Sequence, residues 1–71
     1  MKKILITEFM EQDSVNKISE QFDVNYDPSL YENIEELSSQ IASVDAIIVR
    51  NKTQLNEALL TKARKLRFVG R

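Results

Sequence analysis

The segment AIIVRNKT, residues 46–53, is the most informative part of this 71-residue sequence. Its first half is a short apolar run rich in β-branched residues, which is typical of a central parallel strand covered on both faces. Its second half, Arg50-Asn51-Lys52-Thr53, is polar and positively charged. Ligands of open α/β sheets bind outside the carboxyl ends of the strands. We therefore expect the functional site of this chain at residues 50–53.

Strand and helix patterns alternate along the rest of the chain. Residues 3–7 are a second apolar run, and residues 23–26 alternate polar with apolar positions, as an edge strand does. Apolar residues at helical spacing follow each of these strands, which predicts one helix after Met10 and another over residues 30–41. The apolar positions of these helices are Val15, Ile18 and Phe22 in the first, and Leu30, Ile34, Leu37 and Ile41 in the second.

A third helix and a fourth strand are predicted after residues 50–53. Asn56 is a favourable N-cap, and Leu55 and Leu60 have the spacing of a hydrophobic staple. The helix residues expected to face the sheet are Leu59, Leu60 and Ala63. Residues 66–69 then read as a strand whose Phe68 lies in the core. The element order β-α-β-α-β-α-β indicates a parallel sheet with right-handed crossovers.

Composition and charge exclude several classes of function. The formal net charge of −1 gives no attraction to nucleic acid or to an anionic membrane, and no apolar run approaches the ~20 residues of a membrane-spanning helix. Without cysteine or histidine, and with a single glycine, the chain lacks thiolate chemistry, the commonest general base and a glycine-rich dinucleotide loop. We expect a cytoplasmic protein without a nucleic-acid or membrane partner. The basic run near the end is more typical of a helix C-terminus; its members are Lys62, Arg64, Lys65, Arg67 and Arg71.

The predicted sheet is incompletely covered, because three helices serve four strands. One interpretation is that a partner subunit or a swapped copy covers the last strand, since open edges invite pairing with another chain. The other, which we favour, is that the natural polypeptide continues beyond Arg71, so that residues 1–71 are one incomplete domain.

The polar residues after the central strand also allow two interpretations. A guanidinium can bind a carboxylate or phosphate through two hydrogen bonds, and neighbouring amide and hydroxyl groups can orient the same anion. Residues 50–53 supply all of these groups. Alternatively, they form a solvated loop whose charges balance nearby glutamates.

Three segments together resemble the N-terminus of a D-isomer-specific 2-hydroxyacid dehydrogenase, within the D-3-phosphoglycerate dehydrogenase-like branch. They are KILITEFM at residues 3–10, DAIIVRNKT at residues 45–53 and LRFVGR at residues 66–71. The resemblance implies the first part of a flavodoxin-like substrate-binding domain, with strand order 2-1-3-4 and a fifth strand missing. It also implies an NAD-dependent oxidoreductase that is usually a dimer, whose NAD-binding Rossmann domain is absent from this chain.

The resemblance assigns roles to individual residues. Arg50 and Arg71 match arginines that help bind the anionic substrate, a small 2-hydroxy or 2-keto acid, and Asn51 and Thr53 line the same loop. Many members of the family have serine where this chain has Asn51. The Arg, Glu and His of hydride transfer come later in such enzymes, so this chain alone is expected to be inactive. The rival prediction is a small α/β interaction module that dimerises through its last strand without catalysis.

Overall fold

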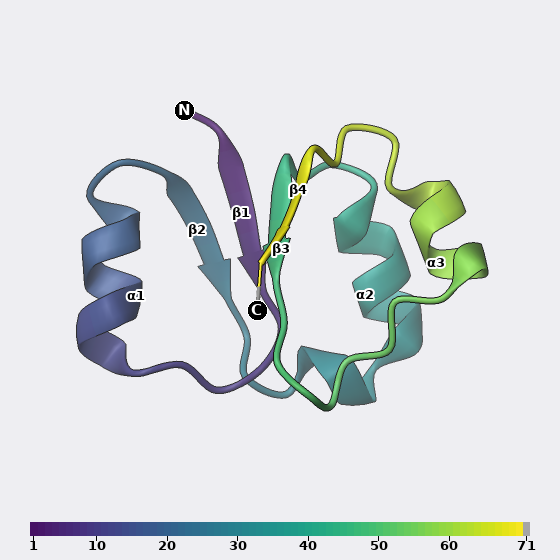
Figure 1. Cartoon of the computed structure of the whole chain (residues 1–71), viewed down its shortest axis with the longest axis horizontal. Helices are drawn as coiled ribbons and strands as arrows, with labels where there is room; N and C mark the ends of the chain where they lie inside the picture. The colour runs from purple at the N-terminus through teal and green to yellow at the C-terminus, as the bar shows by residue number, and fades with distance from the viewer. Residues whose placement is uncertain (71) are drawn as a thin grey trace.

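The strands and helices follow the predicted alternation. The computed structural model describes residues 1–70; Arg71, which the resemblance assigns to the substrate, lies outside the described residues. The four strands are parallel and lie in the order β2-β1-β3-β4 (Figure 1), which confirms the α/β fold class and the predicted order. In chain order the elements are β1 (Lys3–Ile6), α1 (Gln12–Ser19), β2 (Asp23–Tyr26), the 3₁₀ turn η1 (Leu30–Glu32), α2 (Ile34–Ile41), β3 (Ala46–Ile48), α3 (Glu57–Lys62) and β4 (Phe68–Gly70).

The helices lie on two faces of the sheet. Figure 1 shows α1 on one side of the strands and α2 with α3 on the other. The chain runs outward from β1 to β2, and then back across the sheet to β3 and β4. Because crossovers between parallel strands are right-handed, reversing the direction of travel places the helix on the opposite face. The direction changes between β1 and β3, and ligands of such sheets bind at the carboxyl ends of the strands that flank this point.

Side-chain alternation along the strands divides the core in two. In β1, Ile4 and Ile6 pack with Val15 of α1, whereas Leu5 packs with Leu37 of α2. Successive residues of a strand point to opposite faces, so one apolar run serves both layers. The unbroken apolar runs of β1 and β3 therefore follow from their position in the middle of the sheet.

The single helix predicted over residues 30–41 is wrong in its first turn, since the structure divides this segment into η1 and α2. Asn33 separates the two: its φ of −113° and ψ of 87° are not helical, and its side chain accepts the Glu36 N–H at 3.2 Å. Asparagine is favourable at an N-cap because it satisfies an N–H that the helix leaves unpaired. As a result Ile34, which we predicted on the apolar face of this helix, opens α2 with 57% of its surface exposed.

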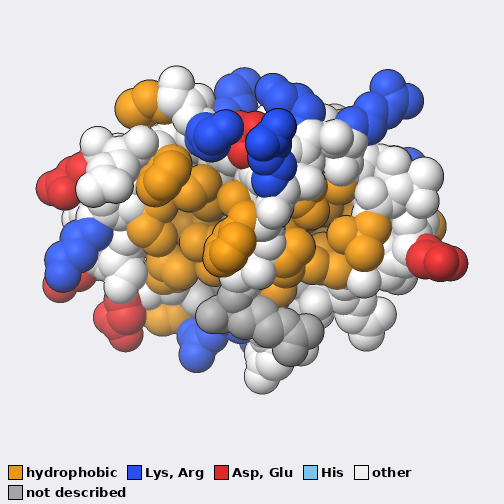
Figure 2. All heavy atoms as spheres, turned by 45° about the horizontal axis from the view of Figure 1, so that its top comes forward, with side chains coloured by type: hydrophobic (Ala, Val, Ile, Leu, Met, Phe, Trp, Pro, Cys, Tyr) orange, Lys and Arg blue, Asp and Glu red, His pale blue; other side chains and the backbone are white. Residues whose placement is uncertain are grey.

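The predictions that Phe68 lies in the core and that the last strand spans residues 66–69 are wrong. β4 begins at Phe68, which is 63% exposed. Phe68 pairs in register with Ala46, so it lies on the face of the sheet that α1 occupies. There α1 packs against β2, at the opposite edge from β4. In the view of Figure 2, hydrophobic side chains spread across the middle of the molecule below a row of Lys and Arg side chains.

The third helix is capped as predicted. The Asn56 side chain accepts the Leu59 N–H at 2.9 Å at the start of α3. Leu59 is buried in the core. Leu60, which we also expected to face the sheet, is 43% exposed. The reason is that successive residues of a helix are rotated by about 100° around its axis, so Leu60 points away from the face that Leu59 buries. Within residues 1–70, no helix has the length and apolarity needed to cross a membrane.

Candidate anion-binding site

The predicted site, residues 50–53, lies beside the carboxyl end of β1. Because β1 and β3 are parallel neighbours, the residues that follow them meet at one edge of the sheet. The Thr7 N–H donates to the Ile48 carbonyl at 3.3 Å, which continues the pairing past the last residue of β1. The next residue, Glu8, is thereby brought to residues 50–53.

The carboxylate of Glu8 binds the backbone of this loop. Its Oε2 accepts the N–H groups of Arg50 at 3.0 Å and Thr53 at 2.7 Å, and its Oε1 accepts that of Lys52 at 3.0 Å. Glu8 is only 3% exposed, although acidic residues outside strands and helices are normally solvated. Hydrogen bonds from N–H groups to a carboxylate are charge-assisted and stronger than neutral ones. The loop is thus folded around an anion that belongs to the protein itself.

The pKa of Glu8 is lowered to about 2, from its usual value of 4.5. Burial is the largest single influence and raises the pKa, because it disfavours the charged form. The hydrogen bonds from the Thr53 side chain and from the backbone of Arg50, Thr53 and Lys52 lower the pKa and together outweigh burial. Glu8 therefore stays ionised at neutral and mildly acidic pH.

Thr53 faces the interior of the site. Its Oγ1 lies 2.7 Å from the Oγ1 of Thr7, and both residues are buried. The Thr53 side chain also hydrogen-bonds to Glu8, so it joins the loop to the end of β1. The structure therefore places Thr53 within the buried network, while its contact with a substrate stays a prediction.

Arg50, Asn51 and Lys52 are exposed and line a pocket of about 160 Å³, together with Tyr31. The Lys52 Nζ lies 5.4 Å from the centroid of the Tyr31 ring, which is within the range of a cation–π interaction. The Arg50 Nη1 donates to the Phe9 carbonyl at 3.5 Å. Two cationic groups and an amide at one pocket are suited to bind a carboxylate, sulfonate or phosphate group.

The structure brings Arg50 and Asn51 to one pocket and adds residues that local sequence patterns do not identify. These are Glu8 and Tyr31, whereas Lys52, which also lines the pocket, belongs to the predicted segment 50–53. A signal for Glu8 does exist, since an acidic residue directly after one strand reaches the same sheet edge as residues 50–53 when the two strands are parallel neighbours. Tyr31 has no comparable signal, because it follows an edge strand and a proline-containing turn.

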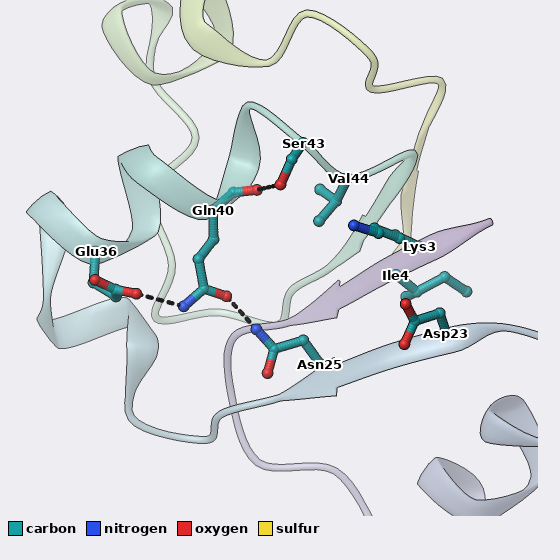
Figure 3. Close-up of a pocket in the computed structure, with 8 residues that line it drawn as sticks. All are labelled: Lys3, Ile4, Asp23, Asn25, Glu36, Gln40, Ser43 and Val44. Carbon is teal, nitrogen blue, oxygen red and sulfur yellow. Dashed lines mark hydrogen bonds between the residues drawn. The ribbon is translucent and has the colours of Figure 1, made fainter. Parts of the chain in front are cut away.

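A second pocket, of about 260 Å³, lies between α2 and the strands β1 and β2 (Figure 3). Asn25 Nδ2 donates to Gln40 Oε1, and Gln40 Nε2 donates to Glu36 Oε1 at 2.9 Å. The Gln40 carbonyl accepts the Ser43 hydroxyl at 3.2 Å. These polar groups satisfy one another and hold α2 beside β2, so we assign this pocket no binding role.

Sequence comparison identifies relatives of this chain. Residues 4–71 match the family described as D-isomer specific 2-hydroxyacid dehydrogenase, catalytic domain. Over 71 residues the chain is 38% identical to (S)-sulfolactate dehydrogenase of Chromohalobacter salexigens and 32% identical to D-3-phosphoglycerate dehydrogenase of Methanocaldococcus jannaschii. Both matches include the whole chain, which spans only 23% of the first relative and 13% of the second.

Proposed function

This chain belongs to the D-isomer specific 2-hydroxyacid dehydrogenase family, and on that premise we propose that it forms part of the substrate-binding domain of such an enzyme. The complete enzyme would transfer hydride between NAD(H) and C2 of a small anionic 2-hydroxy or 2-keto acid. A cytoplasmic homo-oligomer is part of the same proposal. The observation that supports it is the placement of Arg50 and Lys52 at one pocket beside the carboxyl ends of β1 and β3.

The proposed substrate resembles 3-phosphoglycerate in carrying a second anionic group besides its carboxylate. The two relatives are named for sulfolactate and for 3-phosphoglycerate, which both have this property. Arg50 would orient the substrate anion through paired hydrogen bonds, with Asn51 and Thr53 beside it in the loop. Arg71 would assist, an assignment that rests on the resemblance alone. These residues would act through positioning and charge complementarity rather than proton transfer.

NAD is proposed as the cofactor of the complete enzyme and not of this chain. Dinucleotides are bound at a glycine-rich turn that opens a helix, and the single glycine here, Gly70, lies in β4. The residues present therefore do not fit the cofactor. The chain also has no histidine to serve as the acid–base group. We propose that the purified 71-residue chain does not reduce 2-keto acids with NADH, and measurable turnover would contradict this.

A chimaera tests the proposed role in substrate binding. Residues 1–71 replace the matching region of the Chromohalobacter salexigens relative, which supplies the remainder of an enzyme. We expect NADH-dependent reduction of the keto acid that corresponds to sulfolactate. Within this chimaera, Arg50→Ala should raise KM by about 10- to 100-fold, because a charge-assisted contact to the substrate is lost. Lys17→Ala, at an exposed position in α1, is the control. A folded chimaera in which Arg50→Ala leaves both KM and kcat unchanged would contradict the proposal.

The second candidate function is an interaction module that dimerises through β4. The observation in its favour is the exposure of apolar side chains around this strand, which include Phe9, Phe68 and Val69. β4 is also an edge of the sheet, and an edge strand offers backbone groups for pairing. This candidate predicts a stable dimer by light scattering that Phe68→Ser converts to a monomer. A chain that stays monomeric at high concentration would exclude it.

A further inference from the structure

The end of β1 organises two sides of the pocket. Glu8 binds the backbone of residues 50, 52 and 53, while the Thr7 carbonyl accepts the Tyr31 N–H at 3.2 Å. Tyr31 in turn places its ring beside the Lys52 ammonium group. Two consecutive residues thus fix both the loop that carries the cations and the aromatic ring beside it.

The N–H groups of residues 50, 52 and 53 surround the Glu8 carboxylate. Converging backbone N–H groups of this kind are typical of sites that bind external anions. Here the anion is internal, from a residue 42 to 45 positions earlier in the chain. Because these donors are already engaged, an incoming anion would be bound by the exposed side chains of Arg50, Asn51 and Lys52.

We propose that Glu8 is the positioning residue of this site: its carboxylate fixes the loop so that Arg50 and Lys52 present their charges at the pocket. The inference rests on the proposed function, since it takes this pocket as the place where the substrate anion binds. Glu8 is itself negative, which makes the inference testable by the sign of its effect. If Glu8 acted only through its charge, its removal would strengthen anion binding. If Glu8 positions the loop, its removal weakens anion binding.

Two variants separate charge from geometry. Glu8→Gln keeps the side-chain length but turns an NH₂ donor toward the N–H groups of the loop. Glu8→Asp keeps the charge but is one methylene shorter, so it cannot maintain the same three hydrogen bonds. The matched controls are Glu20→Gln and Glu20→Asp, at an exposed position directly after α1. Each 71-residue chain is studied by ¹H–¹⁵N NMR, first alone and then during titration with inorganic phosphate.

We expect both Glu8 variants to shift the amide resonances of residues 50, 52 and 53, and to weaken phosphate binding at the loop by about tenfold. The two Glu20 controls should change neither property. Tighter phosphate binding in Glu8→Gln, or unchanged loop resonances in both Glu8 variants, would overturn the proposal.

Two further outcomes keep this inference separate from the proposed function. A wild-type chain that binds no phosphate would contradict the proposed anion site, and the loop resonances would then decide the positioning role by themselves. If the Glu8 variants fail to fold, amide hydrogen exchange in the wild-type chain decides it. Slow exchange at residues 50, 52 and 53 would support the proposal, and exchange as fast as in an unstructured peptide would overturn it.

Discussion

Glu8 and Asp45 are two carboxylates that accept backbone N–H groups at opposite ends of the central strands. Glu8 lies at their carboxyl ends, and Asp45 lies at their amino ends. Asp45 precedes β3 and accepts the Lys3 N–H at 2.9 Å, whereas Glu8 follows β1 and accepts three N–H groups. The hydrogen bond from Lys3 is the main reason that the pKa of Asp45 is lowered. Asp45 is partly exposed and Glu8 is buried.

The difference shows what burial demands of an acidic residue. Water can solvate Asp45, so its one protein donor adds to a solvation that already exists. Glu8 has lost most contact with water, and an ionised carboxylate that is buried without donors is costly. The loop after β3 supplies those donors, and its conformation follows from that role. At the amino ends of the strands, Asp45 therefore makes a solvated surface contact. At the carboxyl ends, the buried Glu8 carboxylate holds the loop after β3 in one conformation.

Removing the Glu8 carboxylate should have the largest effect on the molecule. Glu8→Ala leaves three backbone N–H groups without their acceptor, and we expect the free energy of unfolding to fall by about 3 kcal/mol or more. Urea unfolding of this variant and of Glu20→Ala measures the difference. A loss below about 1 kcal/mol, comparable with that of a surface residue, would contradict the conclusion that Glu8 stabilises the chain more than Asp45 does.

Acidification should remove most of the same stabilisation without a mutation. The pKa of Glu8 is about 2 in the folded chain against 4.5 ordinarily, so its stabilisation is fully present above pH 4.5 and is lost as the pH falls toward 2. The loss amounts to at most about 3 kcal/mol, and solvent screening near the surface reduces it. Unfolding free energies of the wild-type chain and Glu8→Gln, measured across this range, should converge at low pH. Parallel curves would contradict the assignment.

Loss of the Thr53 hydroxyl should have an intermediate effect. Thr53→Val removes the contact with Thr7 and one of the hydrogen bonds to Glu8, so we expect a destabilisation of about 1–2 kcal/mol. The pKa of Glu8 should rise in the same variant, which NMR titration of its carboxyl carbon would show. Thr61→Val on the exposed surface of α3 is the control, and an equal effect there would mean that the buried hydroxyl pair has no special role.

Neutralising the other carboxylate should have the smallest effect. Asp45→Asn retains a side-chain oxygen that can accept the Lys3 N–H, and the site stays open to water. We therefore expect a smaller change in unfolding free energy than Thr53→Val produces, measured by the same urea titration. An effect as large as that of Glu8→Ala would show that the difference in solvent exposure between Asp45 and Glu8 does not determine how much each carboxylate stabilises the chain.

The topology could be predicted because the relevant signals are local. Short β-branched runs, helical spacing of apolar residues and the N-cap at Asn56 each act within a few residues. The prediction failed at residues 30–41 because Leu30, Leu37 and Ile41 are all buried, as one helix would require, although Asn33 interrupts the backbone. The spacing of apolar residues indicates which residues are buried, but it does not indicate whether they belong to one uninterrupted helix.

Phe68 and Glu8 show the limit of local patterns more clearly. Apolar character places Phe68 in a strand, but its burial depends on which face of the sheet a helix covers at that edge. An acidic residue in a loop is normally solvated. The position of Glu8 directly after a strand indicates that it lies near residues 50–53, but it does not indicate that the side chain is buried. Its burial depends on N–H groups 42 to 45 residues away. The place of Arg50 and Asn51 in the candidate site could therefore be predicted from the sequence. The burial of Glu8 and its hydrogen bonds to the loop could not.

The central position of β1 has a consequence for folding kinetics. β1 lies between β2 and β3, so residues 3–6 complete their pairing only when residues 46–48 arrive. Non-local pairings of this kind close long loops and slow folding. The hydrogen bonds of Glu8 span nearly the same separation. During synthesis, β1 and β2 with α1 emerge first and can associate early. We therefore expect residues 50–53 to take up their conformation only after β3 has paired with β1, so that the candidate site forms late in folding.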